Sequence, residues 1–91
     1  RTANRAELYV NMAQCQRQSQ NLDGAQGSLD IAITLESGRP EIYREQGALF
    51  ELRGDLRAAA AAYNKYLTLS PNAPDRAGVE SQLNRLGGAG D

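Results

Sequence analysis

The chain has 91 residues, a length that suits one small domain, and 41% of them are hydrophobic. Its 10 basic and 11 acidic residues are interspersed and give a formal net charge of −1, so there is no basic field to attract phosphate backbones, and nucleic acid is not an expected partner. No apolar run approaches the length of a membrane span, which argues against direct membrane insertion.

The residue types favour helices. Ala, the best helix former, is abundant, and no run alternates apolar and polar residues as a half-buried strand does. Nine of the ten basic residues are Arg, which together with the abundant Ala and Gly is typical of a GC-rich bacterial genome. Since the sequence begins with Arg1 and shows no signal peptide, we expect a segment of a longer bacterial protein that is soluble, and cytoplasmic or periplasmic.

The first half of the chain predicts two helices after a polar lead-in at residues 1–5. The first spans about 6–18, where apolar and small residues recur at helical spacing. A break at Ser19-Gln20-Asn21 follows, in which Asn21 tolerates left-handed geometry and can cap the next helix. The second helix, about 22–36, contains two glycines and is expected to be the softest of the chain.

The second half predicts three more helices. Ser37-Gly38-Arg39-Pro40 ends the second helix, with Gly38 for the C-terminal turn and Pro40 to open the next helix, a third one at about 41–53. Gly54 supplies a left-handed residue and Asp55 a cap for the fourth helix, 56–69. A proline-bracketed turn then leads to a fifth helix at about 75–86.

The chain also repeats itself with a period of 34 residues and without a gap. Moving each residue back by 34 places Tyr43 on Tyr9, Gly47 on Ala13, Leu56 on Leu22, Ala59 on Ala25, Tyr63 on Leu29, Leu67 on Ile33, Thr68 on Thr34 and Leu69 on Leu35. A fixed period of this length is typical of stacked helix-turn-helix repeats.

The fullest copy of this pattern lies between Tyr43 and Pro71. It places Tyr43, Gly47 and Phe50 on its first helix, Gly54-Asp55 at the turn, and Ala59, Tyr63 and Pro71 in its second half. The arrangement resembles the tetratricopeptide repeat, whose signature alternates aromatic and small residues in this order and ends in Pro. In the first copy Gln16 replaces an aromatic and Ser37 replaces the proline.

The resemblance implies an all-α fold of two tandem helix-turn-helix repeats and a C-terminal capping helix, a fragment of a right-handed α-solenoid. The repeats occupy residues 6–39 and 40–73, the cap 74–86, and a flexible tail 87–91. It also implies a set of residues that form the contacts between paired helices: Tyr9, Ala13, Ala25, Leu29, Tyr43, Gly47, Phe50, Ala59, Tyr63, Tyr66 and Pro71.

Residue size supports two details of this arrangement. Gly47 and Ala59 are expected to be small because the paired helices cross there, and a larger side chain would push the helices apart. Tyr66 stands where the repeat usually has a small residue, and Ala77-Gly78 stands where a further repeat would begin with an aromatic. We therefore expect the small residues of the fifth helix to pack on Tyr66, so that this helix closes the array.

In stacked repeats the first helix of each pair lines a concave surface. The resemblance places the candidate groove residues there: Val10, Gln14, Arg17, Arg44, Ala48, Glu51, Gln82 and Arg85. One subset of the family clamps acidic peptide ends with Lys, Asn and Arg, and Val10, Gln14, Glu45, Asp75 and Val79 stand at those positions, so that clamp is absent. Arg17, Arg44 and Arg85 are either solvated or free for bidentate contacts to an acidic partner.

No catalytic constellation is found. The chain has no His, one Cys, no phosphate-binding glycine loop and no metal-ligand spacing, so we expect neither an enzyme nor a cofactor. Glu41 and Glu45 share a helix face and are expected to be a solvated pair. Cys15 recurs at the place of Leu49, which favours a small buried hydrophobe over a reactive thiol, and a single Cys cannot form an internal disulfide.

These observations predict a protein-interaction module, a scaffold or adaptor whose concave helical groove binds a peptide or protein. The alternative is structural, because Leu8 and Cys15 occupy a flank that an upstream helix would cover. Through this N-terminal edge the chain would form a homo-oligomer or stack on further repeats.

Overall fold

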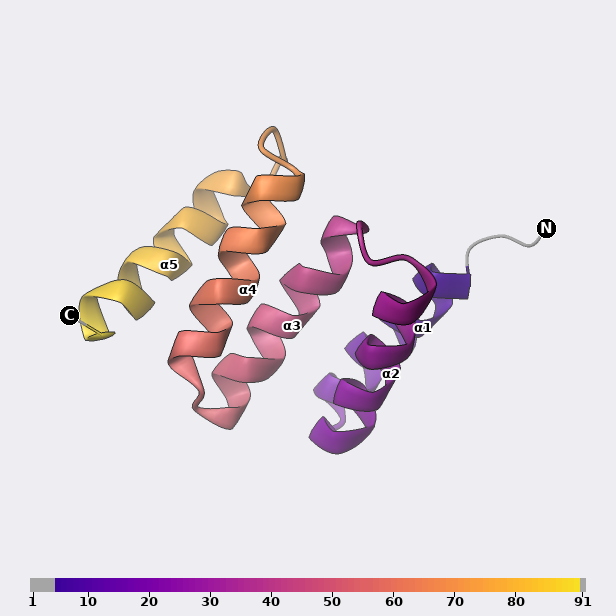
Figure 1. Ribbon diagram of the computed structural model, residues 1–91. Helices are drawn as coiled ribbons and strands as arrows, with labels where there is room; N and C mark the ends of the chain where they lie inside the picture. Colours follow the sequence, from indigo (N-terminus) through magenta and orange to yellow (C-terminus); the bar gives the residue numbers. More distant parts are fainter. Residues whose placement is uncertain (1–4, 91) are drawn as a thin grey trace.

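The computed structural model describes residues 5–90, which form five helices and no strand (Figure 1). The helices are α1 Arg5–Gln18, α2 Leu22–Leu35, α3 Pro40–Arg53, α4 Leu56–Leu69 and α5 Arg76–Gly90. The prediction of an all-α repeat fold is thereby confirmed. The lead-in is shorter than expected, since α1 already begins at Arg5, and residues 1–4 lie outside the described part.

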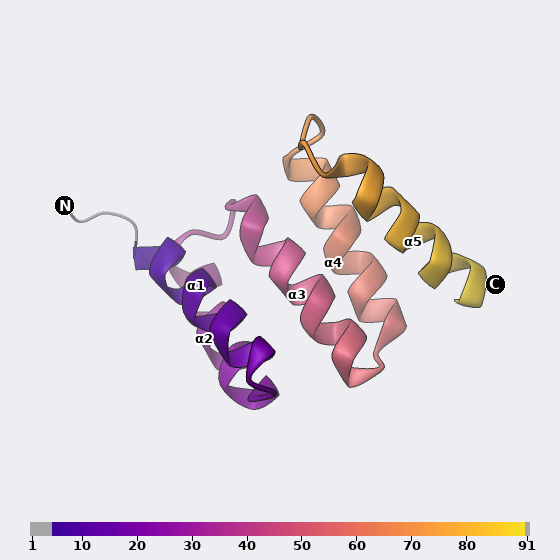
Figure 2. The same cartoon turned by 180° about the vertical axis from the view of Figure 1, so that it is seen from behind.

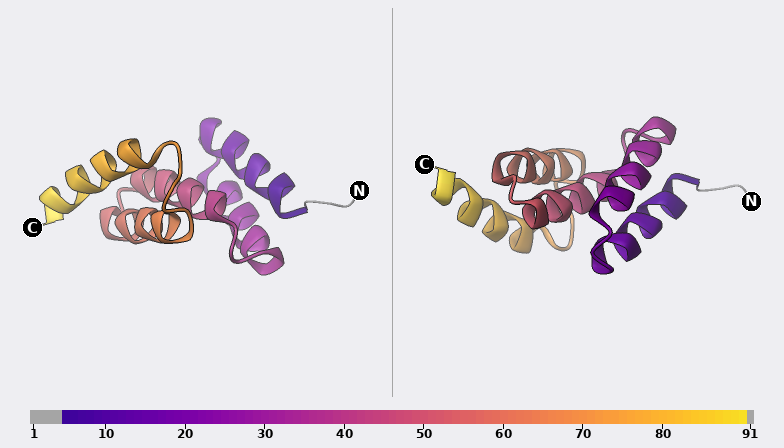
Figure 3. Two further views of the ribbon diagram at one scale, coloured as in Figure 1. Left: turned by 90° about the horizontal axis from the view of Figure 1, so that it is seen from above. Right: turned by 90° about the horizontal axis from the view of Figure 1, so that it is seen from below.

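The helices form antiparallel pairs that stack side by side. α1 pairs with α2 and α3 with α4, while α3 packs against both helices of the first pair and α5 packs against α4 (Figures 1 and 2). Seen from above, α1, α3 and α5 lie on one side of the array and α2 and α4 on the other (Figure 3). We call the side formed by α1, α3 and α5 the inner face, and the side formed by α2 and α4 the outer face.

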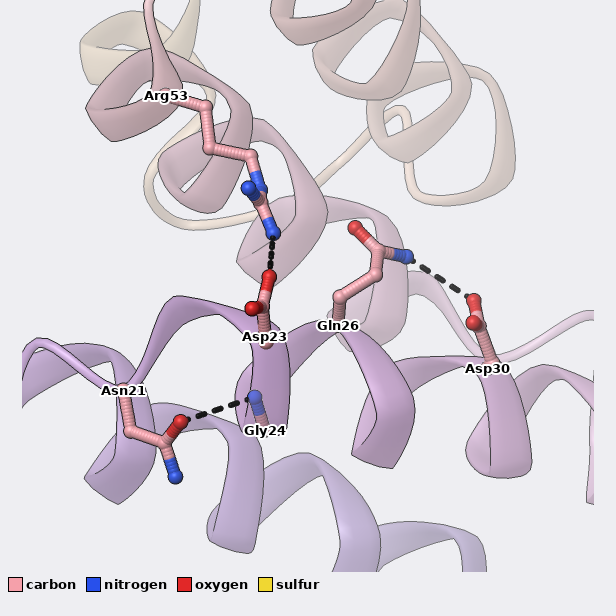
Figure 4. A network of polar contacts seen from close by, with 6 residues as sticks. All are labelled: Asn21, Asp23, Gly24, Gln26, Asp30 and Arg53. Atoms are coloured by element: carbon pink, nitrogen blue, oxygen red, sulfur yellow. Dashed lines mark hydrogen bonds and ion pairs between the residues drawn. The ribbon is translucent and has the colours of Figure 1, made fainter.

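The turns inside the two pairs use the predicted cap residues. The Asn21 side-chain oxygen accepts a hydrogen bond from the Gly24 N–H at 3.1 Å (Figure 4), and Asp55 accepts one from the Ala58 N–H at 3.2 Å. Each bond satisfies a backbone donor that the first turn of a helix leaves unpaired. Gly54 has a φ of 81°, in the left-handed region where glycine carries no steric penalty.

Two details of the turns differ from expectation. In the first pair the left-handed residue is Gln20, with a φ of 70°, and not Asn21, which keeps only the capping role. After α2 the chain turns without a left-handed glycine, because Gly38 has no positive φ. Instead the Glu36 N–H donates to the Ala32 carbonyl at 2.8 Å and the Arg39 N–H donates to the Glu36 carbonyl at 3.2 Å, and Pro40 then opens α3.

The buried side chains form two clusters, one for each helix pair and its neighbour. The first joins α1, α2 and α3 and contains Leu29, Ile42 and Leu49, each at most 1% exposed. The second joins α4 to α5 around Tyr63, Tyr66, Ala73, Val79 and Leu86. Tyr43 packs against both clusters, so the core runs continuously through the array.

Within the second pair, α3 and α4 approach each other most closely at Gly47. A Cβ on this residue would lie 2.5 Å from the Tyr63 Cε1 atom, which is closer than real side-chain contacts come. Gly47 is buried and Ala59 on α4 is fully buried. The ring of Tyr63 therefore lies directly on the α3 backbone.

The C-terminal part of the fold departs from expectation in three ways. α5 continues to Gly90, where a flexible tail was expected from Gly87, and only Asp91 of that segment lies outside the described residues.

Ala77 and Gly78 do not pack on Tyr66: both are exposed, and a Cβ on Gly78 would meet nothing within 4 Å. Tyr66 instead packs in the cluster with Ala73 and Val79. Pro71 is exposed in the turn and takes no part in helix pairing.

One side of α1 is exposed, including Cys15, for which burial was expected. Cys15 is an exposed free thiol, and Leu8 is 63% exposed. Their counterparts 34 residues later, Leu49 and Ile42, are fully buried because the first helix pair covers them. No element in residues 5–90 covers α1 in the same way.

Candidate protein-interaction face

Hollows lie along α3, between this helix and α1, α5 or the α4–α5 turn. One, of about 80 Å³, lies between α1 and α3 and is lined by Glu7, Val10, Asn11, Gln14, Arg39, Glu41, Arg44 and Glu45. A second, of about 250 Å³, reaches from α3 to α5 and is lined by Arg44, Tyr63, Asp75, Gly78, Val79 and Gln82. A third, of about 330 Å³, lies at the start of α3 beside the α4–α5 turn and is lined by Pro40, Glu41, Arg44, Tyr66, Ser70, Pro74 and Asp75. Arg44 lines all three.

Arg17 does not face solvent as a free cation. Its guanidinium bonds to the Glu45 carboxylate, with an Nη2–Oε1 distance of 3.1 Å, and so joins α1 to α3. The Glu45 side chain is 7% exposed and the Arg17 side chain 22%. The prediction that Glu41 and Glu45 form a solvated pair is therefore wrong for Glu45, which is buried with Arg17 as its partner.

A second Arg–carboxylate contact joins the repeats at the C-terminal end of α3, where Arg53 lies 2.6 Å from Asp23 (Figure 4).

Arg44 is held by two groups of the C-terminal half. Its Nη1 atom lies 3.3 Å from the Asp75 carboxylate, and its guanidinium carbon lies 5.8 Å from the centre of the Tyr66 ring, within reach of a cation–π interaction. The Tyr66 hydroxyl donates to the other carboxylate oxygen of Asp75. The hydrogen bonds from Tyr66 and Arg44 hold the pKa of Asp75 below its usual value. The three residues thus tie α3, α4 and the start of α5 together.

This lowered pKa predicts a pH-dependent stability. Because the folded state favours the ionised Asp75, its contribution is fully present above the pKa of the unfolded chain, about 4, and is lost as the pH falls through the lower folded value. The difference in melting temperature between the wild type and Asp75→Asn is therefore expected to shrink as the pH falls from about 6 to about 3. A Tyr66→Phe background, which lacks the hydroxyl donor, serves as the control and should show a smaller change. A difference that stays constant with pH would contradict the assignment.

A second polar network links α3, α4 and α5 beyond Arg44. The Glu51 carboxylate accepts hydrogen bonds from the Tyr63 hydroxyl at 2.8 Å and from the Gln82 amide at 2.8 Å. The Gln82 carbonyl oxygen in turn accepts from Arg85. Burial and the bond to Glu51 raise the pKa of Tyr63, which keeps this hydroxyl protonated as a donor. Sequence reasoning placed Glu51, Gln82 and Arg85 on one surface, and in the structure they also bond to one another.

The other candidate groove residues differ in their access to solvent. Gln14 is exposed and lines the hollow between α1 and α3, whereas Val10 lines the same hollow but is only 6% exposed and belongs to the core. Ala48, the counterpart of Gln14 on α3, is half-buried. A partner on the inner face would therefore contact Gln14 directly, while Val10 shapes the hollow from below.

Asp75 and Glu45 are the residues of this face whose roles were not predicted. Neither role had a periodic signal in the sequence, because the two Arg–carboxylate pairs are separated by 28 and 31 residues and share no register in the repeat. Within residues 5–90 no group of three or more His, Cys, Asp or Glu side chains gathers as a metal site would need. None of the five described helices has the length and apolarity to cross a membrane.

Comparison with known proteins agrees with the geometry. The family model described as Tetratricopeptide repeat matches residues 12–84, which is most of the chain and runs from the second half of α1 through the greater part of α5. No curated protein matches the chain significantly.

Proposed function

This chain belongs to the tetratricopeptide repeat family, and on that premise we propose that its inner face binds a peptide or a protein segment. Tetratricopeptide repeats serve in general as scaffolds for protein–protein interaction and are typically not enzymes. The proposal therefore assigns no catalytic role to the chain.

One observation carries the proposal: the hollows of the inner face run from Gln14 on α1, across Arg44 on α3, to Gln82 on α5. A surface of this kind offers an extended segment a polar hollow between α1 and α3 and a more apolar one between α3 and α5, and the polar groups can fix the direction of the segment. Arg17, Arg44 and Arg85 are already bonded to Glu45, Asp75 and Gln82, so recognition would use the shape of the face and its remaining hydrogen-bonding capacity more than free positive charge.

Selection of peptides from a displayed random library tests this proposal. Peptides selected on the wild type are expected to bind at least about tenfold more weakly to Gln14→Trp, because the new ring fills the hollow between α1 and α3. Gln14 is exposed, so the substitution should leave the fold intact. The matched control is Asn64→Trp, which adds the same ring to the exposed side of α4 on the outer face.

Affinities can be measured by titration calorimetry, with circular dichroism as the check on folding. Peptides that bind Gln14→Trp as tightly as the wild type would place their site elsewhere. Loss of binding in Asn64→Trp alone would move the site to the outer face.

Self-association through the N-terminal edge is the second candidate. It rests on the exposure of Leu8 and Cys15, at positions equivalent to the fully buried Ile42 and Leu49, which stacking on further repeats would use equally. Sedimentation of the chain over a range of concentrations distinguishes this candidate from the first, because a peptide-binding monomer would not change its mass.

A further inference from the structure

The exposed surface of α1 is an apolar edge. Leu8 is 63% exposed, Met12 is 47% exposed and Cys15 is exposed, at positions i, i+4 and i+7 of one helix. Residues at these spacings lie on the same side of a helix, so the three side chains form one strip along α1. We refer to this strip as the α1 edge.

The structure contains a template for what such a strip packs against. Adding 34 to Leu8 and Cys15 gives Ile42 and Leu49 on α3, which are both 0% exposed. These two residues lie in the cluster that includes Ala25, Leu29 and Ala32 of α2. The positions that dock α3 onto the preceding helix pair are therefore apolar on α1 as well, where nothing in residues 5–90 covers them.

The C-terminal end of the array, formed by α5, is small and polar where the α1 edge is apolar. The α5 counterparts of Tyr43, Gly47 and Phe50, which meet α4 in the second pair, are Ala77, Ser81 and Asn84, and all three are exposed. This side of α5 is small and polar, while the apolar face of α4 is already covered by α5. A second copy consequently has no free surface of the α2 type to place on the α1 edge in a head-to-tail stack.

We propose that the α1 edge is a docking surface for a repeat-type helix pair joined ahead of α1, which would pack on it as α1 and α2 pack on α3. The proposal stands on the repeated geometry of this chain and is independent of what the inner face binds. Stacking of this kind buries Leu8 and Cys15 in the same way that Ile42 and Leu49 are buried.

One polar position on α1, Asn11, indicates which residues the docked helix pair should carry. Glu45 of α3 is buried and needs the guanidinium of Arg17 from the preceding pair, whereas its counterpart on α1 is Asn11, which is neutral. The preceding pair therefore needs no cation at the position equivalent to Arg17. Its second helix should present small apolar residues such as those that α2 presents to α3.

A tandem chain tests the proposal, because the 34-residue period allows residues 6–39 to be inserted ahead of Ala6 with the register kept. The inserted copy then provides an α2 surface next to the α1 edge. We expect a thermal midpoint about 5 °C or more above that of the 91-residue chain, since the stack gains a core interface. The double substitution Leu8→Glu/Cys15→Glu at the junction should remove this gain and leave the midpoint of the 91-residue chain nearly unchanged, because both residues are exposed there.

Asn11→Glu is a second test, in which the stability of the tandem chain is expected to increase. In the tandem chain the new carboxylate faces Arg17 of the inserted copy, as Glu45 faces Arg17 in the structure, and should raise the midpoint, whereas in the 91-residue chain it should not. Equal effects of the substitutions in both chains would overturn the proposal. So would a dimer of the 91-residue chain, detected by sedimentation, that Leu8→Glu/Cys15→Glu dissociates, because a second copy would then occupy the edge.

Discussion

Gly47→Ala is expected to destabilise the chain by about 1–3 kcal/mol, although Ala is the better helix former. The added Cβ would lie within 2.7 Å of three atoms of the Tyr63 ring, and the closest of them, Cε1, would be 2.5 Å away. The ring cannot swing aside freely, because its hydroxyl is bonded to Glu51 and its faces are buried in the second core cluster. Urea unfolding followed by circular dichroism measures the loss directly.

Gly27→Ala is the matched control for this prediction. Gly27 lies inside α2, is exposed, and a Cβ there would meet nothing within 4 Å. The same change of one methyl group should therefore stabilise the chain by about 0.5–1 kcal/mol through helix propensity and the reduced entropy of the unfolded state. If both substitutions shifted stability in the same direction, the close approach of α3 and α4 at Gly47 would not be the reason for the glycine.

The fold was predictable because the sequence repeats with a period of 34 residues. Tyr43 on Tyr9 and Ala59 on Ala25 fix the register of the two helix pairs, and Asn21 and Asp55 mark the turns with residues whose side chains cap a helix. These are local or strictly periodic signals, and each helix start depends on only a few neighbouring residues. The end of α5 was misjudged because Gly87 and Gly88 are typical of a helix end, whereas the helix continues to Gly90.

The predictions that failed are those that depend on tertiary packing. Ala77 and Gly78 are small, as a helix crossing would require, but α5 turns its Val79 side toward α4 and leaves them in solvent. Cys15 is exposed because burial at its position depends on a preceding helix pair, which the described residues do not contain. Neither outcome follows from residue type alone, since both depend on which face of a helix receives a neighbour.

Substitutions between the repeats also explain why the first pair tolerates a departure from the pattern. Gln16 stands where the second pair has Phe50, and its side-chain amide contacts the Ser28 hydroxyl at 2.7 Å. Ser28 is in turn the counterpart of Ala62, so a polar pair replaces an aromatic and an alanine. Each member supplies the other with a hydrogen-bond partner at a partly buried place, where an unpaired polar group costs free energy.

Arg17→Ala is the second large effect, an expected loss of about 3 kcal/mol from the free energy of unfolding. The substitution leaves the Glu45 carboxylate, which is 7% exposed, between α1 and α3 without its cation. Arg17→Met combined with Glu45→Met removes both charges with similar side-chain volumes, and should recover most of the stability that Arg17→Ala loses. Urea unfolding of the single and double variants supplies the comparison.

The control is the exposed ion pair between α2 and α3. Arg53 contacts Asp23 at 2.6 Å, but Asp23 is 96% exposed, so Arg53→Ala should cost under about 1 kcal/mol despite the shorter distance. Equal losses from Arg17→Ala and Arg53→Ala would show that burial of Glu45 does not set the cost. A large loss at Arg17 alone would mean that this pair fixes how α1 lies against α3, and with it the hollow between Gln14 and Arg44 on which a partner would dock.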